Sequence, residues 1–292
     1  MVCYMIDAFG TESQRYKYLP DMVSLDKLGC YCLTEPGSGS DASSLKTTAR
    51  EVDNGFIING EKAFISGGGV GDVYVVMART GGTGPSGISA FIVDKDTPGV
   101  SFGKRERKMG WKAQPTASVV LEDAFVPTEN LLGTRDEGFK IAMRALDGGR
   151  VNIAACSIGG GRFCLDTARS YAQSRRQFGR PIGEFQNTQF SIADMATSLQ
   201  ASRLLTYHAA RALDQGLPEA TMDCAMAKRF ATDSCSRVAD RALQILGGYG
   251  YLSDYHVERY LRDLRVHSIL EGTNEVMRII ISRELGRLEP VP

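Results

Sequence analysis

The stretch "GFIINGEKAFISG", residues 55–67, predicts β-structure for the first half of the chain. It reads as two short strands on either side of Asn59-Gly60, because Asn-Gly is a strong signal for a tight turn. Further strand-like stretches follow at short intervals: "DVYVVMART" (72–80), "GISAFIVDKDTPGV" (87–100) and "ASVVLEDAFVP" (117–127). This pattern predicts an antiparallel β-sandwich or barrel, which we assign to residues 24–134.

From about Gly138 the sequence changes to a helical period. Apolar residues then recur at helical spacing, as at Ile192, Met195 and Leu199. Few prolines interrupt this half, and short loops such as "QGLPEA" (215–220) separate long helices, which predicts a four-helix bundle over residues 135–292. Residues 1–23 look like the end of an N-terminal helical domain. The expected fold class is therefore α+β and multidomain, with the β-domain followed by the bundle.

Composition excludes several classes of protein. The 292 residues carry 34 Lys and Arg against 34 Asp and Glu, so nothing indicates a nucleic-acid partner or an anionic membrane surface. No apolar run is long enough to span a bilayer. Seven scattered cysteines form no Cys-x-x-Cys pair and read as buried free thiols, and three histidines are too few to complete a metal site with them.

One acidic residue stands in an unusual setting. In "HSILEGTNEVMR", residues 267–278, the carboxylate of Glu271 follows the apolar pair Ile269 and Leu270, where an ionised group is costly to bury. An apolar setting raises the pKa of a carboxylate and removes its water, which makes it a better base. The competing interpretation is a structural glutamate at a helix N-terminus, just before Thr273.

Two stretches of the β-rich half have the chemistry to bind a large ligand. The Gly-Ser-Gly-Ser turn of "YCLTEPGSGSD" (31–41) exposes backbone N–H groups and hydroxyls that can hold a phosphate or a flavin edge. In "AFISG" (63–67), Phe64 and Ser66 lie on one side of a strand, and an aromatic ring beside a hydroxyl suits a flat heterocycle. Taken alone, the first stretch is more commonly an ordinary polar turn, and Phe64 is equally well an ordinary core residue.

Two further stretches belong to the helical half. In "RRQFGRPIGEFQ" (175–186), Arg175 can fork onto a pyrophosphate and Phe178 can cover an adenine, although a basic helix end is more commonly just solvated. In "QILGGYGY" (244–251), the glycines let a ligand approach the backbone closely. Taken alone, those glycines are better explained as helix caps.

In combination and in this order, these stretches resemble the motifs of the acyl-CoA dehydrogenase family. The resemblance covers essentially the whole chain and rests on "CLTEPGSGSD", "INGEKAFISGG", "SRRQFGRPI", "QILGGYGY" and "ILEGTNEVMR". It is closest to the isobutyryl-CoA branch of the family. It implies FAD-dependent α,β-dehydrogenation of a short branched-chain acyl-CoA, such as isobutyryl-CoA to methacrylyl-CoA in valine breakdown, with electrons passed to electron-transfer flavoprotein.

The resemblance also implies roles for individual residues. Glu271 matches the base that removes the α-proton, whereas Gly149 stands where some relatives place their base and cannot act as one. The implied cofactor-binding residues are Tyr31, Leu33, Thr34, Gly39, Ser40, Phe64, Ile65, Ser66, Arg175, Phe178, Gln244, Gly247, Gly248, Thr273 and Glu275. Among these, the five from Arg175 to Gly248 contact the FAD of a neighbouring subunit. The implied substrate-binding residues are Ser40, Asp147, Arg150 and Gly272.

A homotetramer and a mitochondrial matrix location follow from the same resemblance. The family usually begins with a helical domain well upstream of "MVCYMIDAFG" (1–10), so we expect this sequence to be a fragment, an alternative product or an incomplete form. Two alternatives stay open. One is an acyl-CoA oxidase-like enzyme that passes the electrons to oxygen, which peroxide production would reveal. The other is an inactive truncated subunit or assembly partner.

Overall fold

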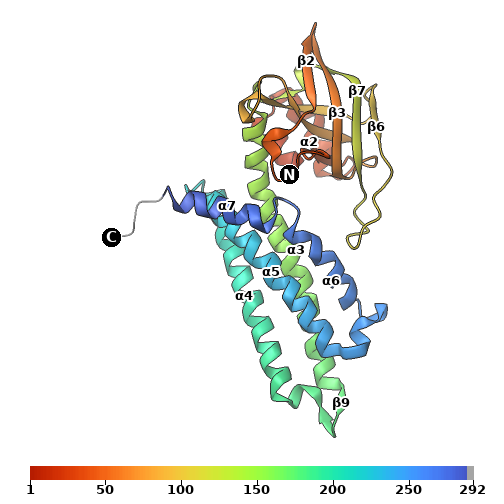
Figure 1. Ribbon diagram of the computed structural model, residues 1–292, viewed down its shortest axis with the longest axis vertical. Helices are drawn as coiled ribbons and strands as arrows, with labels where there is room; N and C mark the ends of the chain where they lie inside the picture. The colour runs from red at the N-terminus through yellow and green to blue at the C-terminus, as the bar shows by residue number, and fades with distance from the viewer. Residues whose placement is uncertain (288–292) are drawn as a thin grey trace. The chain divides into compact units, whose positions relative to one another are not determined.

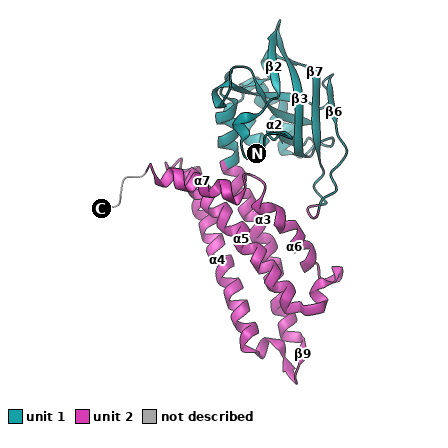
Figure 2. Cartoon of the chain, viewed as in Figure 1, with its two compact units in different colours: residues 1–108, 112–146 teal, residues 109–111, 147–292 magenta. Residues whose placement is uncertain are grey.

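The computed structural model describes residues 1–287, which form two compact units (Figures 1 and 2). Unit 1 comprises residues 1–108 and 112–146. Unit 2 comprises residues 109–111 and the chain from Asp147 onward. The division into three parts that the sequence predicts, at residues 1–23, 24–134 and 135–292, stays a prediction. Residues 288–292, at the end of the third part, lie outside the described residues. Within the described chain, no helix is both long enough and apolar enough to cross a membrane.

Unit 1 combines a sheet with helices. The helices are α1 (Val2–Phe9) and α2 (Glu12–Val23). The strands are β1 (Gly29–Cys32), β2 (Thr48–Val52), β3 (Gly55–Ser66), β4 (Val73–Arg79), β5 (Ile88–Asp94), β6 (Val100–Phe102), β7 (Thr116–Pro127) and β8 (Leu131–Leu132). They follow the order β6-β7-β3-β2-β4-β5-β8, with β1 paired to β4. Most pairs are antiparallel, as expected, but β4 runs parallel to both β1 and β2.

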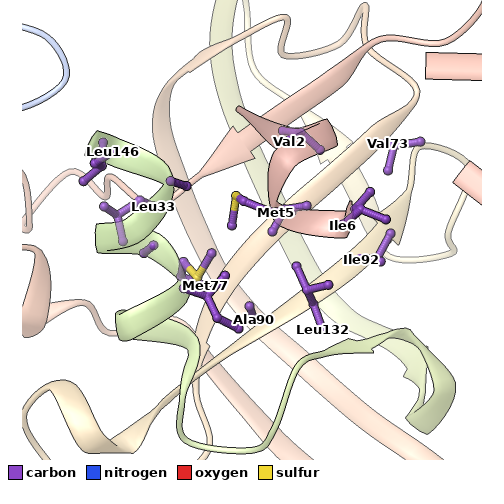
Figure 3. Packing of buried hydrophobic residues seen from close by; sticks show 14 of the residues in the cluster. Val2, Met5, Ile6, Leu33, Val73, Met77, Ala90, Ile92, Leu132 and Leu146 are labelled. Carbon is purple, nitrogen blue, oxygen red and sulfur yellow. The ribbon is translucent and has the colours of Figure 1, made fainter. Parts of the chain in front are cut away.

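The alternation of side chains along β4 separates two apolar cores. Val73, Val75 and Met77 face one core, which also contains residues of α1 and α2 (Figure 3). Tyr74 and Val76 point to the opposite face, into a core made from the sheet's own strands. Because both faces of β4 are covered, the strand is apolar throughout rather than alternating with polar residues.

The prediction of a tight turn at Asn59-Gly60 is wrong. Strand β3 continues through both residues, with an irregularity in its pairing to β7 between Ile58 and Gly60. A Cβ atom at Gly60 would lie 2.7 Å from the Cα atom of Thr47, so the glycine permits close approach of two backbones rather than a chain reversal. The reversal between β2 and β3 instead occurs just before Gly55, where Asn54 adopts a φ of 61°.

Unit 2 is helical and confirms the predicted bundle. Its helices are α3 (Gly138–Ser174), α4 (Gln186–Asp214), α5 (Ala220–Leu246), α6 (Val257–Arg265) and α7 (Asn274–Leu285). Residues 138–146 of α3 are counted with unit 1. A single apolar core joins α3, α4, α5 and α6 through residues such as Leu165, Leu199, Val238 and Leu264. Helix α7 packs on α5, where Met277 and Ile280 meet Ala225.

Candidate active site

The segment between α6 and α7 gives Glu271 an uncommon backbone conformation. A single 3₁₀ turn at residues 266–268 precedes it, and Thr273 caps α7 by accepting a 3.3 Å hydrogen bond from the backbone N–H of Val276. Glu271 has a φ of 57° and Gly272 a φ of 83°. A left-handed conformation is uncommon for a glutamate, and such residues concentrate at functional sites where the surrounding structure holds them in place.

The carboxyl group of Glu271 is the most unusual group of this segment. Its Oε2 atom is buried and has no hydrogen-bond partner among residues 1–287. Burial raises the pKa of Glu271 to about 7, while the positive charges of Arg150 and Lys228 act in the opposite direction. A carboxylate with this pKa is suited to take up a proton at neutral pH.

Asp147 and Arg150 form a buried ion pair on helix α3. Arg150 Nη1 donates a 2.6 Å hydrogen bond to Asp147 Oδ1, and Thr221 Oγ1 on α5 donates one of 2.9 Å to Asp147 Oδ2. Both carboxylate oxygens of Asp147 are therefore engaged within unit 2. The Nε–H of Arg150 is buried and lacks a partner within the described part of the chain, so Arg150 retains a donor for a ligand.

The residues predicted to contact the flavin ring come together in unit 1. The backbone N–H of Ala63 donates to the carbonyl of Thr34 at 2.8 Å, which brings Leu33 and Thr34 beside the end of β3. There Phe64 has a φ of 56° and is 68% exposed. Ser66 is exposed as well, whereas Ile65 faces the core. The predicted alternation along residues 64–66 is confirmed.

The turn that follows β1 is held by buried polar groups. Glu35 and Ser38 exchange two backbone hydrogen bonds, of 3.0 and 3.1 Å. The predicted ligand residues Gly39 and Ser40 are exposed on this turn, and Tyr31 in β1 is half-buried. A Cβ atom at Gly39 would meet no atom within 4 Å, so the turn leaves open space at that position.

A cavity of about 570 Å³ in unit 2 contains three of the predicted residues: Arg175, Gly247 and Gly248. The guanidinium carbon of Arg175 lies 5.5 Å from the centre of the Tyr249 ring, which also lines the cavity. Cβ atoms added at the two glycines would meet nothing within 4 Å, so a flat group can approach the backbone there.

Other predicted residues lie outside this lining. Gln244 is exposed near the end of α5 but does not line the cavity. Phe178 is 91% exposed in the turn between β9 (Arg176–Gln177) and β10 (Arg180–Pro181), where its ring contacts Phe185. Thr273 and Glu275 lie at the start of α7, next to Glu271.

Sequence reasoning missed two fully buried lysines. Lys62 Nζ donates to the carbonyl of Leu33 at 3.2 Å and to Glu35 Oε1 at 2.8 Å. Lys228 lies on α5 and donates to the carbonyl of Gly272 at 2.7 Å. A signal for Lys228 was present, because it shares a helical face with Cys224, Ala231 and Cys235, all of which are buried.

Comparisons with known proteins point to one family for both parts of the chain. The family model for the acyl-CoA dehydrogenase C-terminal domain matches residues 136–286, and the model for the middle domain of the same family matches residues 30–124. The mitochondrial isobutyryl-CoA dehydrogenase of Dictyostelium discoideum is 57% identical over 288 residues, which cover 98% of this chain and 69% of that protein. The corresponding protein of Bos taurus is 54% identical over 285 residues, covering 98% and 68%.

Solved structures show the same fold. Butyryl-CoA dehydrogenase from Megasphaera elsdenii superposes with a TM-score of 0.96 at 44% identity, over 98% of this chain and 75% of that one. A chain from a structure of the electron transferring flavoprotein of Acidaminococcus fermentans superposes with a TM-score of 0.96 at 48% identity, with the same coverage. With both domain models matched and more than half of its residues identical to those of the two mitochondrial relatives, the chain belongs to the acyl-CoA dehydrogenase family of flavin-dependent oxidoreductases.

Proposed function

We propose that this protein dehydrogenates a short branched-chain acyl-CoA, isobutyryl-CoA to methacrylyl-CoA, with Glu271 as the base. The observation that carries the proposal is the buried, unpartnered Oε2 atom of Glu271, with a pKa of about 7. The two similar mitochondrial proteins named isobutyryl-CoA dehydrogenase support this choice of substrate.

Glu271 takes the proton from the α-carbon of the thioester in this proposal. That proton is only weakly acidic, so the site must stabilise negative charge on the thioester oxygen as the proton leaves. The backbone N–H of Glu271 is assigned to that oxygen. The apolar setting keeps water from the carboxylate and thereby preserves its basicity. We assign four residues to the substrate: Ser40, Asp147, Arg150 and Gly272. Of these, Ser40 and the Asp147–Arg150 pair are assigned to its CoA portion.

The residues present fit FAD as the cofactor. FAD supplies the acceptor for the hydride that leaves the β-carbon. We assign Tyr31, Leu33, Thr34, Gly39, Ser40, Phe64, Ile65, Ser66, Thr273 and Glu275 to the FAD bound by the same chain. We assign Arg175, Phe178, Gln244, Gly247 and Gly248 to the FAD of a neighbouring subunit. The open space beside Gly247 and Gly248, with Arg175 in the same cavity, supports the second set.

The remaining parts of the proposal concern assembly and location. A homotetramer is proposed because the second set of residues serves a neighbouring subunit. Electron-transfer flavoprotein is the proposed electron acceptor, supported by the structural match to a chain solved in the study of such a flavoprotein. A mitochondrial matrix location is supported by the mitochondrial relatives.

Anaerobic flavin bleaching tests the proposed function. The full chain, reconstituted with FAD, is mixed with isobutyryl-, butyryl-, 2-methylbutyryl- or isovaleryl-CoA, and the flavin absorbance is followed. For each thioester, the bleaching rate constant is divided by the half-saturation concentration. We expect this ratio to be largest for isobutyryl-CoA. Glu271→Gln should lower the bleaching rate constant by about 10²–10⁴-fold while leaving FAD content unchanged, because the variant keeps the shape of the side chain but not its basicity.

Each assignment has its own contrary result. Preference for another of the four thioesters would overturn the choice of substrate, and wild-type bleaching by Glu271→Gln would overturn the choice of base. Steady-state peroxide production at the rate of substrate turnover would show that oxygen, rather than electron-transfer flavoprotein, takes the electrons. Absence of bleaching by any thioester in a fully FAD-loaded protein would identify an inactive subunit.

A further inference from the structure

Lys228 is a cation enclosed by the middle of helix α5. Its side chain is fully buried, on a helix face whose other members are small or apolar. A buried ammonium is costly unless its protons find acceptors, so the position of its partners indicates what the residue does. Both of its hydrogen-bond partners belong to the segment that carries Glu271.

The contacts of Lys228 hold the chain immediately after Glu271. Its Nζ donates to the carbonyl oxygen of Gly272 at 2.7 Å and to Asn274 Oδ1 at 3.0 Å. The Asn274 Nδ2 group in turn donates to Thr232 Oγ1 at 2.9 Å and to Asp233 Oδ1 at 2.7 Å, both on α5. Helix α5 therefore forms hydrogen bonds to two residues that follow Glu271, Gly272 and Asn274.

Glu271 needs such an anchor. Left-handed residues other than glycine are strained and persist only when their surroundings fix them. A change in the backbone dihedral angles of Glu271 would displace the carbonyl of Gly272 relative to α5 and so break the hydrogen bond from Lys228. We propose that Lys228 is a positioning residue for the proton transfer: it holds the carbonyl of Gly272 and the side chain of Asn274, and so fixes the turn that presents Glu271.

The charge of Lys228 supports the same role. Burial, followed by the nearby charge of Arg150 on α3, lowers the pKa of Lys228 to about 8, so the side chain is mostly protonated at neutral pH. The charged groups that interact with it are Arg150, Asp233 on α5, Glu271 and Glu275 in α7, and the titratable ring of His267 lies near it as well. Since its positive charge lowers the pKa of Glu271, Lys228 also keeps part of that carboxyl ionised and able to accept a proton.

Two variants separate the hydrogen bond from the charge. Lys228→Met keeps the length and apolar volume of the side chain but removes the donor and the charge. Lys228→Gln keeps a donor but not the charge. Cys235→Ala is the matched control, because Cys235 is buried on the same face of α5 but belongs to the apolar core that α5 shares with α3 and α4.

Flavin bleaching by isobutyryl-CoA and carbon-13 NMR of labelled glutamate carboxyls are measured for each FAD-loaded variant. We expect Lys228→Met to lower the bleaching rate constant by about 10²-fold, the scale for small misplacement of a reacting group, and Lys228→Gln to lower it by about tenfold. In both variants the Glu271 carboxyl, identified by its loss in Glu271→Gln, should titrate at higher pH than in the wild type. Cys235→Ala should keep the wild-type rate and titration.

This inference rests on the proposed base, and the variants distinguish the two. Bleaching by Glu271→Gln at the wild-type rate would overturn the proposed function itself. Loss of bleaching in Glu271→Gln, with wild-type rate and titration in Lys228→Met, would overturn only the positioning role. If Lys228→Met does not fold, the same two measurements on Lys228→Gln test the positioning role. A wild-type bleaching rate together with a wild-type titration of Glu271 would again overturn that role.

Discussion

At the scale of single residues, Glu271 shows how burial and neighbouring charges together set a chemical property. Burial drives its carboxyl toward the neutral form, and the cations Arg150 and Lys228 restrain that effect. The result is a pKa of about 7, well above the usual value of a glutamate. Arg150 is in turn paired with Asp147, so the positive charge near Glu271 is itself held in place.

The first prediction concerns the pH dependence of catalysis. A base works only when deprotonated, so the bleaching rate constant should rise with pH through about 7. For one group with this pKa, the rate constant at pH 8 should exceed that at pH 6 by about tenfold. Stopped-flow bleaching with isobutyryl-CoA well below its half-saturation concentration measures this, because it reports the pKa of the substrate-free protein, and the slow Glu271→Gln variant should show no such rise. A level profile from pH 6 to 8 in the wild type would contradict the titration.

At the scale of elements, the buried ion pair between Lys62 and Glu35 connects β3 to the turn after β1. Lys62 and Glu35 are almost completely enclosed, and Glu35 also accepts hydrogen bonds from the backbone N–H groups of Lys46 and Thr47, at 2.6 and 2.9 Å. Because Lys62 also holds the carbonyl of Leu33, the pair positions the segments assigned to the flavin ring.

The second prediction tests this pair. Lys62→Met leaves Glu35 buried without its cation and should lower the free energy of unfolding by about 3–5 kcal/mol. Adding Glu35→Gln should recover part of that loss, because the double variant buries no unpaired charge. Urea unfolding measures both effects. Lys17→Met is the control, since its ion pair with Asp94 is about half exposed and should contribute less than about 1 kcal/mol. Equal losses for Lys62→Met and Lys17→Met would refute the argument.

At the scale of the whole molecule, binding and acid stability are properties of many contacts at once. The cavity with Arg175 lies in unit 2, and the residues assigned to the flavin ring lie in unit 1. Under the proposed assembly, Arg175 serves a cofactor held mainly by another subunit, so cofactor binding and association are thermodynamically linked.

The third prediction follows from this linkage. Arg175→Ala should lose FAD and dissociate to smaller species together, and added FAD should partly restore the larger assembly. Light scattering on size-exclusion fractions gives the mass, and the absorbance ratio gives the FAD content. Arg169→Ala is the control, because Arg169 is exposed on α3, which ends just before Arg175, and it forms an ion pair with Asp166. A full complement of FAD in an unchanged assembly of Arg175→Ala would refute the cross-subunit role.

The fourth prediction concerns acid unfolding. His267 is buried, its Nδ1 lies 2.8 Å from Ser157 Oγ, and burial lowers its pKa to about 4. Between pH 6.5 and 4 the unfolded chain binds this proton and the folded chain does not, so stability should fall as pH falls through this window, by up to about 3 kcal/mol. Glu271 acts oppositely, because its raised pKa favours the folded state as pH falls from 7 to 4.5.

The acid prediction is therefore measured in the Glu271→Gln background. Urea unfolding at pH 7 and pH 4.5 should show a smaller loss of stability for Glu271→Gln/His267→Gln than for Glu271→Gln alone. His256→Gln in the same background is the control, because His256 is largely exposed at the start of α6. An equal loss with and without His267 would contradict the assignment of the acid sensitivity to this residue.

Local patterns in the sequence determined much of this protein. The strand-like stretches at residues 72–80, 87–100 and 117–127 became β4, β5 and β7, and the helical spacing of Met195 and Leu199 placed both in the bundle core. Such periods depend only on the geometry of strand and helix, so they can be read before the chain is folded. The family motifs were also readable, because they are short and contiguous.

Tertiary structure alone decided the features that depend on residues distant in the chain. Asn59-Gly60 has the local signal of a turn, but pairing with β7 and the close approach of Thr47 keep it within β3. Lys228 stands 44 residues before the carbonyl that it holds, and no spacing rule links the two positions. The left-handed backbone of Glu271 and its raised pKa also depend on the folded chain. Lys228 on α5 holds the carbonyl that follows Glu271, and burial raises the pKa against the opposing charges of Arg150 and Lys228.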